Sequence, residues 1–297
     1  MPQEQTAGPA ARKIGNREFV PAATAFGHTM LVPRDDTIGR SILKHGIYDR
    51  KGIAIMNALL QQMQEPVVLD IGANIGNHAL AMGTVAHTVH CFEPQLGIFQ
   101  VLRENIDSNG IGNIAAHNLG LATTAVEQEI YIPARDNLGA ATLRNELKAE
   151  DALVETIRLE AGDAFIDGLG LQQLDLVKID VEGFEIQVLE GLRETVDRFR
   201  PVIFMEWDQA ITKREAGESA IFQQLVEPYL PYQVGSNYDR ELWPANLPGR
   251  LRRVFYKALH SRKWTVREAD LVGDYGNLIL VPRERTALVE SLPPQVL

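Results

Sequence analysis

The sequence predicts an α/β fold in which helices cover both faces of a mostly parallel sheet, and two observations support this prediction. Short segments that are apolar on both faces recur at 67–71, 88–92, 115–119, 174–179 and 201–205. Segments with the apolar spacing of helices lie between them, at 77–85, 96–109 and 185–199. Strands without a polar face must be covered on both sides, and their alternation with helices is typical of parallel sheets.

The residues before this region are expected to cover the sheet. Residues 1–20 are predicted to be a disordered tail, because the chain begins with a Pro-, Gln- and Ala-rich segment. Residues 21–65 form the cover, in which we expect a strand at 29–32 and helices at 38–44 and 51–64. Residues 35–37 supply a candidate N-cap for the first of these helices.

The remainder is predicted to be part of the same domain, with an insertion near its end. The core spans 66–236, and its further strands are expected at 127–132, 155–159 and 232–236, with a loop at 133–149. The insertion spans 237–274 and is rich in Trp, Tyr and Arg. Residues 275–297 contain the last strand, at 276–282, and a tail.

Composition is that of an ordinary globular protein, and it argues against several classes of function. The formal net charge of −10 disfavours non-specific binding to nucleic acid or anionic lipid. Cys91 is the one cysteine, so no internal disulfide forms, and its apolar surroundings favour burial in a strand. No apolar run approaches the ~20 residues that span a bilayer, and the N-terminus lacks a signal-peptide pattern. We therefore expect a cytoplasmic protein.

The turn after the first buried strand has the composition of a nucleoside site. Gly72 and Gly76 follow the strand at 67–71 and precede a helix. Glycines let the backbone turn tightly and approach a ligand, and α/β sheets bind ligands at the carboxyl ends of their strands. Taken alone, however, the segment is also compatible with an ordinary strand-to-helix turn.

Two acidic positions narrow the choice of nucleoside. Glu93 ends the second buried strand about twenty residues after the first glycine, where a carboxylate can accept hydrogen bonds from both ribose hydroxyls. A dinucleotide site needs Gly-x-Gly-x-x-Gly for its pyrophosphate, but three residues separate Gly72 from Gly76. Asp70 offers a partner for the ammonium group of S-adenosylmethionine. The spacing therefore favours S-adenosylmethionine over NAD.

The fourth strand is followed by three carboxylates, Asp180, Glu182 and Glu185. The strand before Asp180 is apolar, so Asp180 is delivered to the edge of the sheet and is predicted to line the pocket beside the sulfonium. Glu185 has two interpretations, as a pocket residue or as a first-turn helix acid that the helix dipole favours.

Four motifs in this order, at 68–76, 92–94, 102–109 and 178–185, resemble the FkbM family of methyltransferases. The resemblance extends over roughly residues 36–282. It implies a Rossmann-like seven-stranded methyltransferase sheet, mostly parallel, with the last strand antiparallel. It also implies S-adenosylmethionine as methyl donor and O-methylation of a sugar, glycan or polyketide hydroxyl.

The predicted cofactor site combines this resemblance with the residue chemistry. The contacts implied by the resemblance are Gly72, Asn74, Gly76, Glu93, Asn118 and Leu119. The others predicted are Asp70, Ala73, His78, Pro94 and Asp180.

A general base is expected to take the proton of the acceptor hydroxyl. The candidates, with the histidines as the weaker ones, are Asp180, Glu182, Glu206, His45 and His78. We expect no metal, and the alternative is a magnesium ion held by the carboxylates of Asp180, Glu206 and Asp208.

The insertion is predicted to contact the acceptor. If the strand at 232–236 runs parallel to the sheet, the insertion begins on the cofactor side. Aromatic faces pack on sugar rings and Arg binds carboxylate or phosphate, and the residues concerned are Tyr238, Trp243, Arg252 and Arg253. A solvated amphipathic helix, or a contact with a partner subunit in a homo-oligomer, is the alternative.

Two other functions are considered. A nicotinamide-dependent oxidoreductase would need the missing middle glycine and leaves residues 180–183 unexplained. A non-catalytic nucleoside- or glycan-binding protein of the same fold is opposed by the intact carboxylates of the motifs. The expected partner is a small-molecule or glycan acceptor, without nucleic acid or a membrane span.

Overall fold

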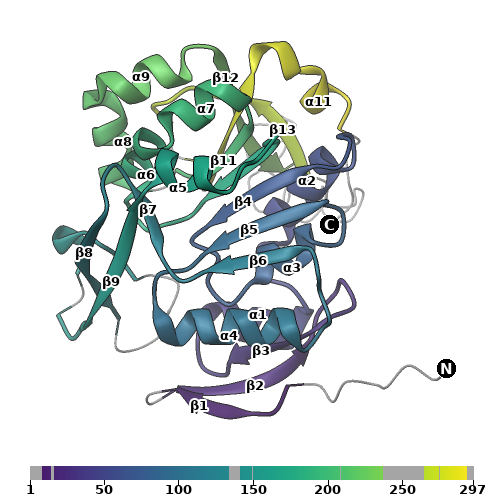
Figure 1. Ribbon diagram of the computed structural model, residues 1–297. Helices are drawn as coiled ribbons and strands as arrows, with labels where there is room; N and C mark the ends of the chain where they lie inside the picture. Colours follow the sequence, from purple (N-terminus) through teal and green to yellow (C-terminus); the bar gives the residue numbers. More distant parts are fainter. Residues whose placement is uncertain are drawn as a thin grey trace, which may run out of the picture.

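The computed structural model describes residues 9–14, 17–133, 141–148, 150–207, 209–236, 264–273 and 275–292. A large sheet lies between two groups of helices, and a smaller sheet near the N-terminus packs beside one of these groups (Figure 1). The predicted α/β class with helices on both faces is therefore confirmed. Among the described residues, no helix has the length and apolar character that a membrane crossing requires.

The large sheet has the strand order β13-β12-β14-β11-β10-β4-β5-β6. Its strands are β4 Val67–Ile71, β5 Thr88–Phe92, β6 Ile114–His117, β10 Leu176–Ile179, β11 Val202–Glu206, β12 Tyr229–Ser236, β13 Trp264–Glu268 and β14 Asn277–Pro282. The five strands from β6 to β11 are parallel. Their carboxyl ends therefore meet at one edge of the sheet, where the sequence predicts the site.

The described sheet has eight strands, which corrects the predicted seven. β14 is antiparallel to β11, as predicted for the last strand. The additional strand, β13, comes from the predicted insertion and pairs antiparallel with β12. Without β13, the edge of β12 would present unpaired N–H and C=O groups. β12 is antiparallel to β14 and so runs parallel to β11, which places Ser236 at the carboxyl edge.

Alternate side chains of the central strands enter two separate cores. Val68 packs on one face and Leu69 on the other. The helices of the first face are α1 Thr37–His45, α2 Arg50–Leu60, α3 Asn77–Met82, α4 Leu96–Asp107 and α11 Ala287–Glu290. Those of the second face are α5 Gly162–Gly168, α6 Glu185–Gly191, α7 Arg193–Phe199, α8 Ala210–Glu218 and α9 Ala220–Val226. This two-sided burial explains why the strands lack a polar face.

The predicted helix at 185–199 is divided between α6 and α7. A Cβ on Gly191 would lie 2.2 Å from the backbone oxygen of Ala122, so the end of α6 packs directly on the neighbouring backbone. The helices α8 and α9, which follow β11, were not predicted.

The N-terminal cover is a three-stranded antiparallel sheet of β1 (Arg12–Ile14), β2 (Arg17–Ala23) and β3 (Thr29–Pro33). Its first two strands correct the predicted disorder of residues 1–20. Phe19 has an exposed fraction of 1%, so burial of an apolar side chain orders this segment.

A motif asparagine ties this cover to the core. The side chain of Asn105 in α4 accepts a hydrogen bond from the Leu31 N–H at 2.6 Å and donates to the carbonyl oxygens of Leu31 and Ile75. The Asn109 side chain likewise accepts a hydrogen bond from the Thr29 N–H and donates one to the Thr29 carbonyl oxygen. These asparagines of the 102–109 motif therefore have a structural function.

A third sheet, in the order β7-β9-β8, extends beyond β6 (Figure 1). Its strands are β7 Gly120–Ala122, β8 Val126–Ile132 and β9 Leu153–Ala161. Two short 3-10 helices, η2 Asn145–Leu147 and η4 Arg283–Arg285, complete the described elements. The sheet matters for function because its apolar side chains reach the carboxyl edge of the large sheet.

Candidate active site

Gly72 begins the turn between β4 and α3, and this position has no room for a side chain. Its φ is +78°, and a Cβ there would lie 1.9 Å from the backbone oxygen of Asp180. The contact arises because β4 and β10 are neighbouring parallel strands whose turns meet at the carboxyl edge. The first and last of the four motifs are therefore in direct backbone contact.

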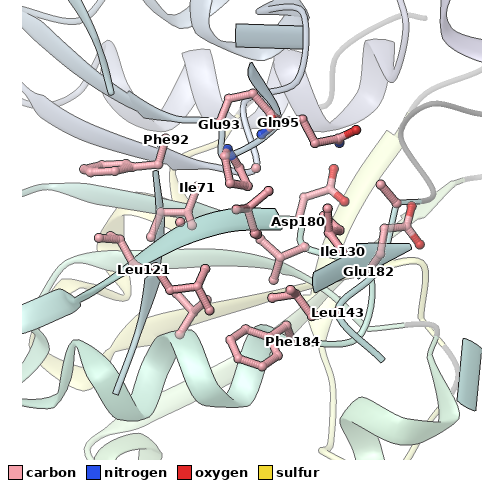
Figure 2. A pocket seen from close by; sticks show the side chains of 18 of the residues that line it. Ile71, Phe92, Glu93, Gln95, Leu121, Ile130, Leu143, Asp180, Glu182 and Phe184 are labelled. Atoms are coloured by element: carbon pink, nitrogen blue, oxygen red, sulfur yellow. The ribbon is translucent and has the colours of Figure 1, made fainter. Parts of the chain in front are cut away.

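A cavity opens between these turns and the third sheet, and we call it the Glu93 cavity. It encloses about 620 Å³, a volume that includes open solvent at its mouth. Its polar lining includes Asn74, Glu93, Gln95, Asp180 and Glu182. Its apolar side chains come from several strands and turns and include Phe92, Leu121, Ile130, Leu143 and Phe184 (Figure 2). Leu159 also lines the cavity. The cavity therefore combines an apolar wall with a few convergent polar groups.

Glu93 is held in position by the backbone. Its carboxylate accepts hydrogen bonds from the N–H of Asn74 at 3.0 Å and of Gln95 at 2.9 Å. Burial raises the pKa of Glu93 to about 7, although these two hydrogen bonds act in the opposite direction. Each carboxylate oxygen keeps a second lone pair, so Glu93 can still accept hydrogen bonds from a ligand.

Several predicted cofactor residues support this cavity without lining it. Asn118 donates to the backbone oxygens of Glu93 and Pro94, both at 3.0 Å, and fixes the turn after β5. Leu119 is buried next to Gly120 and Leu121, which do line the cavity. Pro94, which was predicted to contact the cofactor, lines the cavity itself. Gly76 has a φ of +94° and shapes the turn before α3.

Asp70 lies inside the protein and does not line the Glu93 cavity. Its carboxylate is fully buried and accepts a hydrogen bond from Lys178 Nζ at 2.9 Å. The same ammonium group donates to the Gly72 oxygen at 3.2 Å and lies 3.6 Å from the Asp180 carboxylate. Burial alone would lower the pKa of Lys178, but Asp70 and Asp180 raise it. Lys178 thus connects the turn after β4 with the turn after β10, a function that the sequence did not indicate.

Glu185 has a structural function. It lies in the first turn of α6 and does not line the Glu93 cavity, which excludes its interpretation as a pocket residue. The side chain is fully buried and accepts hydrogen bonds from the N–H groups of Val181 and Gly183 and from the Thr212 hydroxyl. Burial raises the pKa of Glu185, partly offset by these bonds. It thereby supports the turn in which Glu182 and Gly183 both have positive φ values.

A second cavity adjoins the first, and we call it the His78 cavity. It encloses about 1140 Å³ including open space and shares Gly72, Asn74, Asp180 and Glu182 with the Glu93 cavity. The side chains that line this second cavity alone include Ile38, Tyr48, Asp49, Asn77, His78, Glu206 and Asn277. Ala73 also lines it. Asp180 and Glu182 therefore lie at the junction of the two cavities.

The three predicted catalytic carboxylates, Asp180, Glu182 and Glu206, lie close together in the His78 cavity. One oxygen from each of Asp180, Glu182 and Glu206 lies within 4.8 Å of the others. Burial, and then these acids with Asp49, raise the pKa of Tyr48 to about 12. The spacing suits oxygen coordination of one divalent cation, with Glu182 in place of the predicted Asp208, which lies outside the described residues.

The other residues predicted from the sequence lie outside the Glu93 cavity or outside the described residues. His45 is exposed at the end of α1 and lines neither cavity. His78, predicted as a cofactor contact, lines the His78 cavity and not the Glu93 cavity. The predicted acceptor contacts Tyr238, Trp243, Arg252 and Arg253 lie outside the described residues. Tyr48 and Asp49 were missed, because nothing in the sequence before α2 distinguishes them from a helix cap.

Comparison with known proteins points to one family. The model of the methyltransferase FkbM domain matches residues 70–239. The hexuronic acid methyltransferase AglP of Haloferax volcanii is 31% identical over 150 residues, which cover 50% of this chain and 59% of that protein. Methyltransferase 1 of Beauveria bassiana is 29% identical over 143 residues, which cover 42% of this chain and 57% of that protein. The chain thus spans less than two thirds of the length of either relative.

A solved structure also matches. The crystal structure of methyltransferase FkbM from Methylobacillus flagellatus is 17% identical, with a TM-score of 0.40, over 64% of this chain and 43% of that one. The predicted family and the methyltransferase class agree with the family model and with the names of these relatives.

Proposed function

The chain belongs to the FkbM family of methyltransferases, and on this premise we propose that it methylates a hydroxyl group of a sugar or glycan with S-adenosylmethionine. The observation that supports the proposal best is the junction of the two cavities at Gly72, Asn74, Asp180 and Glu182. A methyl group must pass between two bound molecules, so the donor and the acceptor each need a space that opens on the other. The Glu93 cavity takes the donor and the His78 cavity takes the acceptor.

Each part of the donor has a counterpart in the Glu93 cavity. The ribose hydroxyls donate to Glu93, the carboxylate at the end of β5. The adenine packs on the apolar wall that includes Leu121 and Leu159. The positively charged sulfonium and ammonium groups lie on the side of Asp180, which lines both cavities.

The acceptor side favours a polyhydroxylated molecule. Asp49, Asp180, Glu182 and Glu206 bring carboxylate oxygens to the His78 cavity, and these accept hydrogen bonds from hydroxyl groups. The similarity to a protein named as a hexuronic acid methyltransferase supports a sugar acceptor. In the reaction, the acceptor oxygen displaces S-adenosylhomocysteine from the methyl carbon, and alignment of oxygen, carbon and sulfur supplies much of the rate.

The proposal is tested by calorimetry and by a labelled-methyl screen. S-adenosylhomocysteine is expected to bind and NAD is not, and label from S-adenosylmethionine should appear on a monosaccharide glycoside, a nucleotide sugar or a glycan. Binding without transfer to any of these acceptors would favour the non-catalytic alternative. Binding of NAD alone would contradict the proposed donor.

A further inference from the structure

His78 and Asp49 form a hydrogen-bonded pair in the wall of the His78 cavity. His78 is the second residue of α3 and is 7% exposed, and its Nε2 lies 3.2 Å from Asp49 Oδ2. Because Nε2 faces Asp49, Nδ1 is the ring nitrogen that remains for a hydroxyl in the cavity. A carboxylate in this position selects the tautomer with the proton on Nε2 and stabilises the imidazolium after protonation.

Asp49 is held toward His78 by its backbone. Its φ of +43° places a non-glycine residue in the left-handed region, a conformation that surrounding contacts must maintain. The Asn77 side chain supplies two such contacts to the preceding residue. It accepts a hydrogen bond from the Tyr48 N–H at 3.2 Å and donates one to the Tyr48 carbonyl oxygen at 3.0 Å. Asp49 Oδ1 also accepts from the Gly52 N–H at 3.1 Å.

Gly52 leaves space for this carboxylate. The residue lies in the first turn of α2, where an alanine would favour the helix. A Cβ at Gly52 would lie 2.0 Å from Asp49 Oδ2 and 2.9 Å from its Cγ. The nearest atoms all belong to the Asp49 side chain, so a methyl group here would displace the carboxylate and leave the backbone in place.

We propose that His78 is the catalytic proton acceptor of the methyl transfer and that Asp49 is its positioning residue. The inference rests on the proposed function, because it places the acceptor hydroxyl in the His78 cavity. The hydroxyl oxygen forms a bond to the methyl carbon while the carbon–sulfur bond breaks, and its electron pair stays on sulfur as S-adenosylhomocysteine forms. The hydroxyl proton moves to His78 Nδ1, and the resulting imidazolium pairs with Asp49 before it releases the proton to water.

The other ionisable groups of this cavity have different environments. Tyr48 adjoins Asp49 in the turn before α2, Asp180 and Glu182 follow β10, and Glu206 ends β11. Asp180 already pairs with Lys178, and Glu182 accepts from the Gln209 amide at 3.4 Å. Among the side chains that line this cavity, His78 supplies the imidazole, the group that most often takes and returns a proton in general acid–base catalysis.

The first test is the tautomer of His78 and needs no acceptor. Long-range 1H–15N NMR spectra of the full chain saturated with S-adenosylhomocysteine, assigned with a His78→Ala variant, should show the proton on Nε2 and a bare Nδ1. A neutral ring with its proton on Nδ1 would overturn the inference. Failure of S-adenosylhomocysteine to bind in calorimetry would instead contradict the proposed function.

The second test separates positioning from stability. Gly52→Ala should lower kcat about 10- to 100-fold by moving Asp49. The melting temperature should change little, because alanine favours the helix while loss of the hydrogen bond from the Gly52 N–H to Asp49 opposes that gain. Gly217→Ala in α8 is the matched control, because nothing lies within 4 Å of its Cβ position, and it should leave kcat unchanged. The probe acceptors are methyl glucoside and methyl glucuronide, with labelled S-adenosylmethionine. A Gly52→Ala enzyme with wild-type kcat would remove Asp49 from the proposal.

The third test concerns His78 directly. His78→Ala should lower kcat about 10²- to 10⁴-fold, and added imidazole should restore part of the rate. His87→Ala, a substitution at an exposed histidine that lines neither cavity, is the control. Wild-type turnover in His78→Ala would overturn the inference. If the wild type methylates neither probe, the proposed function fails for these acceptors, and the tautomer still decides the inference.

Discussion

The two cavities share one wall but differ in chemistry and in the way the chain builds them. Most side chains of the Glu93 cavity are apolar, around a single deeply buried carboxylate. The His78 cavity has Tyr48, Asp49, His78 and Glu206 on its own part of the wall. An apolar wall suits the purine of a constant donor, whereas ionisable groups suit proton transfer and a hydroxylated acceptor.

The two cavities should respond differently to amino-acid substitution. The Glu93 cavity depends on closely packed turns, since a Cβ at Gly72 would lie 1.9 Å from the backbone oxygen of Asp180. The His78 cavity depends on side chains that adjoining elements hold in place. Substitutions in the backbone turn should therefore have the largest effect on donor binding, and substitutions of individual side chains should have smaller effects on binding or on methyl transfer.

Gly72→Ala should have the largest effect, because it combines a positive φ with a collision against backbone. The matched control is Gly110→Ala, where φ is +63° and nothing lies within 4 Å of the Cβ position. The control should cost about 1–2 kcal/mol of unfolding free energy from its φ alone. Gly72→Ala should cost more and abolish binding of S-adenosylhomocysteine, as measured by urea denaturation and calorimetry. Equal costs would mean that the turn can relax.

Asp180→Asn should lower kcat about 100-fold by removing a charge at the junction of the cavities, while S-adenosylhomocysteine still binds. The amide keeps the size of the side chain, so folding should be retained. Steady-state kinetics with a methylated probe acceptor measure the change. Full turnover in this variant would remove Asp180 from the reacting centre and leave the other cavity groups to explain the rate.

Glu93 should make donor binding depend on pH. Its pKa of about 7 means that the free protein must release a proton before both carboxylate oxygens can face the ribose hydroxyls. The affinity for S-adenosylhomocysteine should therefore fall by up to about tenfold per unit as pH decreases below 7. In Glu93→Gln the affinity should be about tenfold lower at pH 8 and independent of pH. A pH-dependent Glu93→Gln variant would assign the titration to another group.

The same shift has the opposite consequence for stability. Unfolded Glu93 loses its proton near its ordinary pKa of 4.5, whereas the folded protein retains it to about pH 7. The stabilisation from this group is complete below pH 4.5 and is lost as pH rises through 7. Urea denaturation of the wild type and of Glu93→Gln across this window separates the Glu93 contribution.

Metal removal should have the smallest effect. Dialysis against EDTA is expected to leave turnover unchanged, because Lys178 already neutralises part of the charge of Asp180 at the carboxylate cluster. The control is restoration with excess magnesium. A large loss of activity that magnesium reverses would establish Asp180, Glu182 and Glu206 as a metal site and revise the chemistry of the junction.

Much of the Glu93 cavity could be predicted from the sequence. Gly72 and Glu93 directly follow predicted strands, and parallel pairing brings the ends of such strands to one edge whatever the rest of the chain does. The predictions for Asp70 and Asn118 were less accurate in detail. A side chain at the end of a strand can point into the cavity or into the protein interior. Asp70 points inward because it pairs with Lys178, and Asn118 bonds to the turn after β5; both partners are brought close by tertiary packing.

The sequence by itself determined the α/β sheet and the position of the turn at Gly72, because these depend on local patterns of apolar residues and glycines. The resemblance to the family was carried by four motifs in order along the chain. Only the tertiary structure decided that Asp49 lies beside His78. The two residues are 29 positions apart, and their contact requires α2 and α3 to pack together. It also decided that Glu185 supports a turn while Asp180 lines both cavities, since burial and hydrogen bonding, not residue type, assign function to a carboxylate.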